Sequence, residues 1–267
     1  MTAFSFIESP FIYQFMNRII FITGATSGFG KAIAEKFAGG GDHLIITGRR
    51  KERLDDLAQN LTTRFGVNIL PLHFDVQDKE AVFRELKNLP EQWKSIDILV
   101  NNAGLALGRD YFDEASLEDW ETMIDTNVKG LLYVSKAVMP YLKKGGGGHI
   151  INMGSIAGKE VYEKGNAYCA SKHAVDAISK SMRVDLMRHA IKVTVIHPGA
   201  AETEFSLVRF KGDEKLAKSV YTGFQALSAD DVADVVFYCA NLPAHVCIND
   251  LVITATAQAS SVYFHKV

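Results

Sequence analysis

The chain has 267 residues, 48% of them hydrophobic, and its formal net charge is −2. Its 29 basic and 31 acidic side chains are mixed along the sequence, so we expect no strongly charged surface that would attract nucleic acid or an anionic membrane. No apolar run reaches the ~20 residues of a membrane-spanning helix. The three cysteines lack the close spacing of a metal site. The composition therefore predicts a soluble, cytoplasmic protein that binds neither nucleic acid nor membrane and holds no metal ion.

The first residues of the chain differ in composition from the rest. Residues 1–15 are rich in aromatic side chains, contain Glu8 and Pro10, and lack the basic start and cleavage site of a secretory signal. Met16 stands directly before the first segment with a regular pattern. We therefore predict that residues 1–15 are an N-terminal appendage or a misassigned start, and that residues 16–267 form a single domain.

Short β-branched runs alternate with longer amphipathic stretches along this domain. Strands are predicted at residues 18–23, 43–47, 68–74, 96–101, 149–153, 192–197 and 251–254. Helices are predicted at residues 28–38, 52–63, 79–89, 117–142, 166–188 and 230–240. Such alternation is typical of βαβ units, whose right-handed crossovers place helices on both faces of a parallel sheet. The sequence therefore predicts an α/β protein with a doubly wound Rossmann fold, built on a single seven-stranded parallel sheet.

Residues 199–218 show no clear period and are interpreted as a loop that follows a strand. In open α/β sheets, ligands bind beyond the carboxyl ends of the strands. This segment is therefore expected to lie over a ligand site.

A glycine-rich turn connects the first predicted strand to the first predicted helix. Its sequence is Thr23-Gly24-Ala25-Thr26-Ser27-Gly28-Phe29-Gly30. Backbone amides in such a turn, together with the helix N-terminus, can hold a pyrophosphate. A tight turn that uses glycine for steric reasons alone is the alternative. Because the motif stands at the first strand-to-helix junction, we predict dinucleotide binding by Gly24, Thr26, Ser27, Gly28, Phe29 and Gly30.

The residues after the second strand indicate which dinucleotide is bound. An acidic residue that would bind the adenosine ribose 2′-hydroxyl of NAD is expected there, but the sequence reads Thr47-Gly48-Arg49-Arg50. Two guanidinium groups suit a 2′-phosphate, although both arginines could instead be solvated residues that open the next helix. The sequence therefore predicts NADP as the cofactor.

Asp75 and Val76 follow the third predicted strand and are further candidates for the cofactor site. The Asp75 carboxylate could accept a hydrogen bond from the adenine amino group. Alternatively, it could cap the helix that begins after Gln77.

Tyr168 and Lys172 are four residues apart in a helical pattern, so their side chains share one face of the helix. A phenol with a pKa of about 10 is a poor base at neutral pH, and a neighbouring ammonium group is expected to lower that pKa. Ser155, at the exit of the fifth strand, could bind the substrate oxygen whose proton Tyr168 exchanges. The three residues predict general acid/base chemistry, although a Tyr–Lys pair alone is common in helices.

These motifs occur in a characteristic order: the glycine turn, Asn101-Asn102-Ala103-Gly104, Asn127, Ser155, Tyr168-x-x-x-Lys172 and Pro198-Gly199. From about Arg18 to its end, the chain resembles the short-chain dehydrogenases/reductases. The resemblance implies an oxidoreductase that transfers a hydride to or from a nicotinamide. It also implies a homotetramer in which helices pair across two-fold axes.

The resemblance further implies a role for each motif. Asn127 would bend its helix and hold a water that links Lys172 to solvent, while Lys172 would also bind the nicotinamide ribose. Asn101, Asn102, Ala103 and Gly104 would line the adenosine side of the cofactor site. Thr203, after the Pro198-Gly199 turn, would touch the nicotinamide carboxamide or the phosphates. Alternatively, the asparagines could be turn or surface residues, and Ser155 could be a cap.

Within the family, several stretches resemble the NADP-dependent dehydrogenases of serine, L-allo-threonine and other 3-hydroxy acids, which also reduce malonic semialdehyde. These stretches are residues 48–54, 101–108, 119–127, 203–213 and 242–249. A hydroxy acid or its oxo form needs a cation for its carboxylate, and Arg209 and Lys211 lie in the segment expected over the site. The alternatives are a general NADPH-dependent carbonyl or 3-oxoacyl reductase, and a dinucleotide sensor without catalysis.

Overall fold

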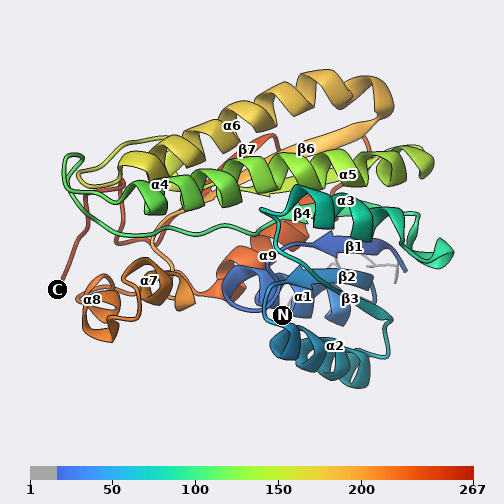
Figure 1. Cartoon of the computed structure of the whole chain (residues 1–267), viewed down its shortest axis with the longest axis horizontal. Helices are drawn as coiled ribbons and strands as arrows, with labels where there is room; N and C mark the ends of the chain where they lie inside the picture. Colours follow the sequence, from blue (N-terminus) through green and yellow to red (C-terminus); the bar gives the residue numbers. More distant parts are fainter. Residues whose placement is uncertain (1–16) are drawn as a thin grey trace, which may run out of the picture.

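The computed structural model describes residues 17–267, so the appendage predicted at residues 1–15 lies outside the described part of the chain. Seven parallel strands form one sheet in the order β3-β2-β1-β4-β5-β6-β7 (Figure 1). The strands are β1 (Ile19–Ile22), β2 (His43–Gly48), β3 (Ile69–His73), β4 (Ile98–Asn101), β5 (Gly148–Met153), β6 (Ile191–Pro198) and β7 (Asp250–Ile253). The predicted strands and the single parallel sheet are confirmed.

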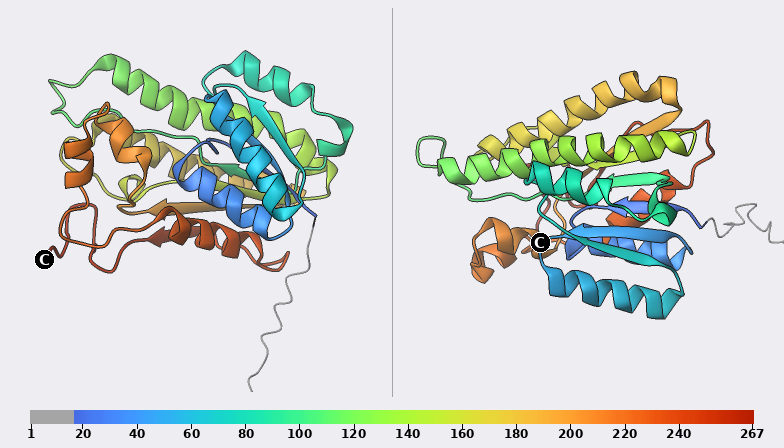
Figure 2. Two further views of the ribbon diagram at one scale, coloured as in Figure 1. Left: turned by 90° about the horizontal axis from the view of Figure 1, so that it is seen from below. Right: turned by 45° about the vertical axis from the view of Figure 1, so that its right-hand side comes forward.

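The sheet is covered by helices on both faces (Figures 1 and 2). Helices α1 (Gly28–Gly39), α2 (Lys51–Phe65) and α9 (Ala229–Ala240) pack on one face. Helices α3 (Lys79–Lys87), α5 (Leu131–Lys144) and α6 (Asn166–Leu186) cover the other face. Because both faces are covered, β1 is buried along its whole length, as its continuous apolar sequence predicts. The doubly wound Rossmann fold predicted from the sequence is confirmed.

The predicted helix at residues 117–142 is wrong as a single helix. It consists of α4 (Leu117–Ile124), a π-helical segment η2 (Asp125–Gly130) and α5. At η2, a β-carbon on Gly130 would lie 2.7 Å from Cγ2 of Val76, and the Asn127 side chain turns inward to backbone groups of Leu105. The close packing at Gly130 and the hydrogen bonds of Asn127 accompany the wider, π-helical turn of η2. A hydropathy pattern does not distinguish such a turn from a continuous α-helix.

The interpretation of residues 199–218 as a loop is also corrected. The segment contains two short helices, α7 (Glu204–Arg209) and α8 (Glu214–Ser219). Thr203 caps α7 by accepting a hydrogen bond from the Phe205 amide, and Asp213 caps α8 through the Leu216 amide. Each helix has only 6 residues, too few to show a period in the sequence.

Three short 3₁₀ segments complete the described chain: η1 (Glu91–Trp93), η3 (Ile156–Gly158) and η4 (Met187–His189). Among residues 17–267, no helix is both long and apolar enough to cross a membrane.

Candidate active site

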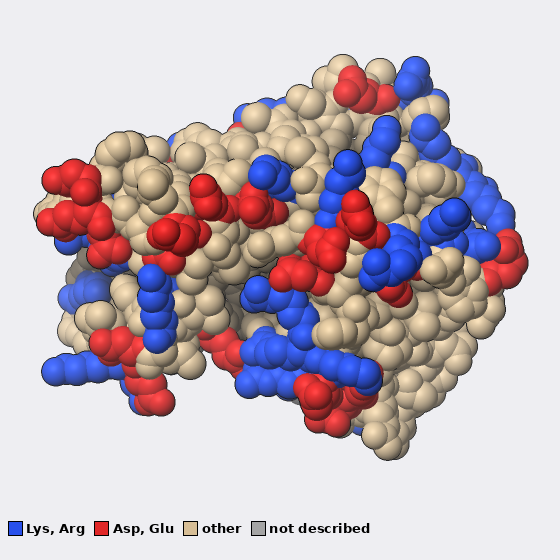
Figure 3. All heavy atoms as spheres, viewed as in Figure 1, with Lys and Arg blue, Asp and Glu red and all other residues tan. Residues whose placement is uncertain are grey.

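A cleft of about 1180 Å³ opens beyond the carboxyl ends of the strands. Figure 3 shows the surface hollowed there, with Lys and Arg side chains gathered along one edge of the hollow. The cleft is larger than the roughly 300–1,000 Å³ of most small-ligand pockets, which suits a dinucleotide together with a small substrate. The predicted site residues line it, with four exceptions: Gly30, Asn101, Asn127 and Lys211.

The glycine turn is packed tightly against the end of β4. Gly24 has φ +67°, and a β-carbon there would lie 2.9 Å from the Ala103 Cα atom. A β-carbon on Gly30 would lie 2.2 Å from the Gly24 carbonyl oxygen. The Asn102 amide donates hydrogen bonds to the carbonyls of Thr23 (2.9 Å) and Gly24 (3.1 Å). Gly30 therefore packs against the backbone of the turn and does not line the cleft, whereas Gly24 does.

The N-terminus of α1 offers donors for an anion. Ser27 occupies the N-cap position without a side-chain cap hydrogen bond, and the first turn carries no acidic residue. The first amides of a helix lack partners within it and carry partial positive charge. Arg50 donates hydrogen bonds to the hydroxyls of Thr26 (2.8 Å) and Ser27 (2.7 Å) beside this turn. The arrangement fits the pyrophosphate of a dinucleotide.

The two predicted 2′-phosphate ligands lie at one end of the cleft. A guanidinium nitrogen of Arg49 is 3.5 Å from the Asp75 carboxylate. Arg50 forms an ion pair of 3.0 Å with Glu204, the first residue of α7. The ion pairs of both arginines are exposed to solvent, and Arg50 is also held to the Thr26 and Ser27 hydroxyls beside the glycine turn. This end of the cleft fits NADP.

Asp75 does not cap the helix that follows it. Its carboxylate accepts a hydrogen bond from the Gln77 amide at 3.0 Å. The N-cap of α3 is Asp78, which accepts a hydrogen bond from the Ala81 amide. Asp75 and Val76 both line the cleft beside the arginines.

Tyr168 and Lys172 lie at the other end of the cleft, in the first turns of α6. Both side chains are buried, and the Lys172 Nζ atom lies 6.0 Å from the centre of the Tyr168 ring. Lys172 donates a hydrogen bond to the Met153 carbonyl at 2.9 Å. Ser155 is the N-cap of η3, where its hydroxyl accepts a hydrogen bond from the Ala157 amide, and its side chain is close enough to Tyr168 to act on the pKa of the phenol. The three predicted catalytic side chains are thus brought together.

The pKa of Tyr168 differs from the sequence-based expectation. Burial raises it above the ordinary value of a phenol, while the hydrogen bond with Ser155 and the charge of Arg209 oppose that rise. Burial also lowers the pKa of Lys172 to about 8. The prediction that Lys172 lowers the pKa of Tyr168 is therefore contradicted: burial dominates, and the groups that oppose it are Ser155 and Arg209.

Asn127 lies in η2, behind the cleft, with its side chain buried. Its amide donates hydrogen bonds to the Leu105 carbonyl (2.8 Å) and the Ser171 hydroxyl (3.0 Å). Its carbonyl oxygen accepts a hydrogen bond from the Leu105 amide at 2.8 Å. A β-carbon on Gly104 would lie 3.2 Å from that oxygen and 3.5 Å from Lys172 Nζ. The Asn127 side-chain oxygen and the Lys172 ammonium therefore both lie close to Gly104, although Asn127 does not line the cleft.

The two candidate substrate cations have different environments. Arg209, in α7, places its guanidinium carbon 5.5 Å from the centre of the Tyr168 ring and donates a hydrogen bond to the Tyr162 hydroxyl at 3.0 Å. Lys211 lies outside the cleft and pairs with Asp119 at 2.8 Å, with 60% of its side chain exposed. The expectation for Lys211 is therefore corrected: the chain turns after α7, and only Arg209 points to the site.

Other residues of this region were not anticipated, or were placed differently. Asn101 does not line the cleft, because its buried amide donates hydrogen bonds to Ser135 and Asn152, each at 2.9 Å. Arg109 and Tyr162 do line it, although no spacing in the sequence distinguishes them. Their positions depend on long connecting segments, which carry no periodic signal.

Comparisons with known proteins agree with this geometry. The short chain dehydrogenase family model matches residues 18–213. NADP-dependent 3-hydroxy acid dehydrogenase YdfG of Salmonella typhi is 47% identical over 242 residues, covering 90% of this chain and 96% of that protein. Sulfoacetaldehyde reductase 2 of Chromohalobacter salexigens is 47% identical over 249 residues, covering 93% of this chain and 98% of that protein.

A solved structure is similar over almost the same length. The closed form of serine dehydrogenase complexed with NADP⁺ has a TM-score of 0.86 at 46% identity, covering 93% of this chain and 100% of that chain. The resemblance inferred from the ordered motifs is therefore confirmed. The chain belongs to the short-chain dehydrogenase family.

Proposed function

We propose that this protein transfers a hydride between NADP and a small 3-hydroxy acid, with Tyr168 as the general acid/base. The observation that carries the substrate class is the guanidinium of Arg209 beside Tyr168, because a carboxylate near the reacting carbon needs a cation. The serine, L-allo-threonine and 3-hydroxypropionate type of substrate fits this requirement.

NADP as the cofactor is supported from two directions. Arg49 and Arg50 line the cleft where the 2′-phosphate is expected. Of the proteins compared above, the 3-hydroxy acid dehydrogenase is named as NADP-dependent and the serine dehydrogenase structure is complexed with NADP⁺. When bound, the nicotinamide supplies the acceptor or donor of the hydride. We propose that the cofactor is held by the predicted cofactor residues that line the cleft. Among them, Pro198, Gly199 and Thr203 are proposed to lie at the nicotinamide side.

The chain's own residues handle the proton. In oxidation, Ser155 orients the substrate hydroxyl and Tyr168 accepts its proton, so that no free alkoxide has to persist. The Lys172 ammonium, 6.0 Å from the centre of the Tyr168 ring, is proposed to stabilise the phenolate that forms. Asn127 is proposed to hold a water between Lys172 and solvent, through which the proton leaves. In reduction the same proton returns to the substrate oxygen.

The test of this function is a substrate panel followed by nicotinamide absorbance. Protein and NADP are mixed in turn with L-serine, L-allo-threonine, 3-hydroxypropionate, 2-hydroxyethanesulfonate and an unbranched aliphatic alcohol. NADP reduction with the 3-hydroxy acids, and little with the alcohol, is expected. Faster turnover of the sulfonate would move the substrate class to that of the sulfoacetaldehyde reductase relative. Faster turnover of the neutral alcohol, or of 3-oxoacyl compounds in reverse, would favour a general carbonyl reductase.

Replacing Arg209 with Gln is expected to raise the KM for the hydroxy acid about 10- to 100-fold, since a charge-assisted hydrogen bond is worth about 1.5–3 kcal/mol. Turnover of a neutral alcohol should change far less. Lys211→Gln is the matched control: it removes a nearby charge that lies outside the cleft. Equal KM increases in both variants would contradict a direct role for Arg209.

The pH dependence should report the effect of Lys172 on Tyr168. The oxidation rate is expected to rise with pH, because the phenolate is the base. Lys172→Met removes the ammonium and should move this rise to higher pH. Since burial lowers the pKa of Lys172 to about 8, wild type and variant should differ most below that pH and converge above it. Rates at saturating NADP measure both profiles, and superimposable profiles would contradict the assignment.

We also propose that the protein is a homotetramer in the cytoplasm, by analogy with its family and because Cys169, Cys239 and Cys247 are unpaired. Two apolar side chains, Val184 near the end of α6 and Met187 at the start of η4, are exposed in the single chain, which supports burial against another copy. Sedimentation at micromolar concentration should give about four times the 29.4 kDa chain mass. A species of one chain mass only would contradict the assembly.

A further inference from the structure

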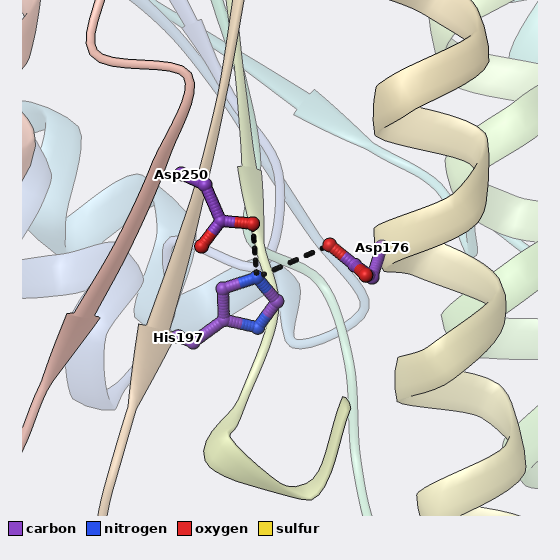
Figure 4. Close-up of side chains that lie close together, drawn as sticks. All are labelled: Asp176, His197 and Asp250. Atoms are coloured by element: carbon purple, nitrogen blue, oxygen red, sulfur yellow. Dashed lines mark ion pairs between the residues drawn. The ribbon is translucent and has the colours of Figure 1, made fainter. Parts of the chain in front are cut away.

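A partly buried cluster of charged residues lies behind the candidate catalytic centre. It consists of Asp176 in α6, His197 in β6, Asp250 at the start of β7, and Lys159 directly after η3. Figure 4 shows Asp176 and Asp250 approaching the same edge of the His197 ring from two sides. The His197 Nε2 atom is 3.5 Å from a carboxylate oxygen of Asp176 and 3.7 Å from one of Asp250. The proposed function assigns no role to this cluster.

The cluster has the atoms of a metal site, but its charge is already balanced. The ligand-type atoms of Asp176, His197 and Asp250 lie within 4.8 Å of one another. The ammonium of Lys159 pairs with both carboxylates, at 3.0 Å from Asp176 and also with Asp250. Lys180 adds a second pair with Asp176 at 2.7 Å. A metal ion would have to displace the Lys159 ammonium, which already occupies the space between the carboxylates.

His197 contacts the backbone of Ser155. Its Nδ1 atom lies 2.9 Å from the Ser155 carbonyl oxygen and 3.3 Å from the Ser155 amide nitrogen. The shorter contact requires a hydrogen on Nδ1, which then donates to the carbonyl. The ring is also closely packed against the chain here, because a β-carbon on Gly154 would lie 2.5 Å from Nδ1. His197 therefore fixes the chain at the exit of β5.

The Ser155 carbonyl, which can only accept a hydrogen bond, is what places a hydrogen on Nδ1. Burial lowers the pKa of His197 and so favours the neutral ring at pH 7. The charge of Lys159 acts in the same direction, while the hydrogen bond with the Ser155 backbone and the two carboxylates oppose it. The Nε2 atom is fully buried and makes no hydrogen bond within the described residues.

We propose that His197 is a positioning residue, which holds the Ser155 backbone so that the Ser155 hydroxyl faces Tyr168. The inference rests on the proposed function, because it acts through Ser155. The path runs from the charged cluster through the imidazole to the Ser155 carbonyl, and from the Ser155 side chain to Tyr168. Sequence analysis did not single out His197, since it is one histidine within a buried strand.

Two substitutions at His197 separate the two ring nitrogens. The amide nitrogen of Asn reaches about the position of Nδ1, and that of Gln about the position of Nε2. His197→Asn keeps a donor for the Ser155 carbonyl, whereas His197→Gln loses it. We expect His197→Gln to lower kcat at least tenfold with the NADP Kd changed less than about twofold. His197→Asn should recover most of the lost kcat.

The contrast between the variants decides the proposal. Equal kcat for the Asn and Gln variants, or an NADP Kd that weakens as much as kcat falls, would overturn it, because a purely structural role predicts such parallel losses. If neither variant folds, Asp250→Asn replaces them, since this side chain is one-third exposed. It should lower kcat at least threefold and speed amide hydrogen exchange at residues 154–158. No change in either property would overturn the proposal.

Measuring Tyr168→Phe in the same assay distinguishes failure of the positioning role of His197 from failure of the proposed function. An inactive Tyr168→Phe enzyme together with a fully active His197→Gln enzyme would remove only the positioning role. A fully active Tyr168→Phe enzyme would remove the assigned catalytic chemistry, and the positioning role with it.

Discussion

Replacing Tyr168 with Phe is expected to lower kcat about 10²- to 10⁴-fold, the usual contribution of a general acid/base. The substitution keeps the ring and removes only the hydroxyl. The ring packs against Phe205 with 5.7 Å between centroids, and it lies under the Arg209 guanidinium, so these contacts can persist. The measurement is kcat with the substrate that the panel identifies.

Two controls separate loss of chemistry from loss of structure in this variant. Its NADP Kd and its thermal unfolding midpoint should be close to those of the wild type, because the ring that packs in the core is kept and the arginines expected to bind the 2′-phosphate lie at the other end of the cleft. Ser155→Ala should also lower kcat, since the substrate oxygen loses its second partner. An undiminished rate for Tyr168→Phe would place the acid/base elsewhere.

Replacing both Arg49 and Arg50 with Ala is expected to weaken NADP binding about 10²-fold and NAD binding hardly at all. Two charge-assisted contacts are worth about 3–6 kcal/mol together, and about 1.4 kcal/mol is tenfold in affinity. The lower end applies here, because the side chains are 60% and 41% exposed and each gives up an ion pair, with Asp75 or Glu204. Kd values for both cofactors provide the measurement.

A matched control for the double variant lies in the same helix. Lys51 begins α2, is exposed and pairs with Asp55 at 2.5 Å, and it does not line the cleft. Lys51→Ala should leave both Kd values unchanged. Equal weakening of NADP and NAD binding in the double arginine variant would contradict a contact with the 2′-phosphate.

The fold was predictable because its signals are local. Strands buried on both faces must be apolar throughout, as β1 is, and a parallel sheet needs a crossover helix between successive strands. The glycine turn was predictable for a similar reason, since Gly24 and Gly30 allow no β-carbon at their positions. Helical spacing places Tyr168 and Lys172 on one face of α6, and the order of the surrounding motifs distinguishes this pair from others of the same spacing.

The remaining features depend on contacts between distant segments. The inward hydrogen bonds of Asn127 in η2 involve Leu105 and Ser171, which are 22 and 44 residues away. Whether Arg209 or Lys211 faces the cleft depends on how α7 ends. The pKa of Tyr168 depends on its burial by several segments. None of these properties follows from a local pattern, so they could not be predicted from one sequence.

The central claim is hydride transfer from a 3-hydroxy acid to NADP, and following the hydrogen tests it most directly. The protein is incubated with NADP and 3-hydroxypropionate that carries deuterium on the carbon bearing the hydroxyl. Mass spectrometry then measures the reduced cofactor. The account predicts that it is heavier by one deuterium and that Tyr168→Phe greatly slows its formation. Two results would contradict the account: reduced cofactor that contains no deuterium, or no formation of reduced cofactor with any 3-hydroxy acid.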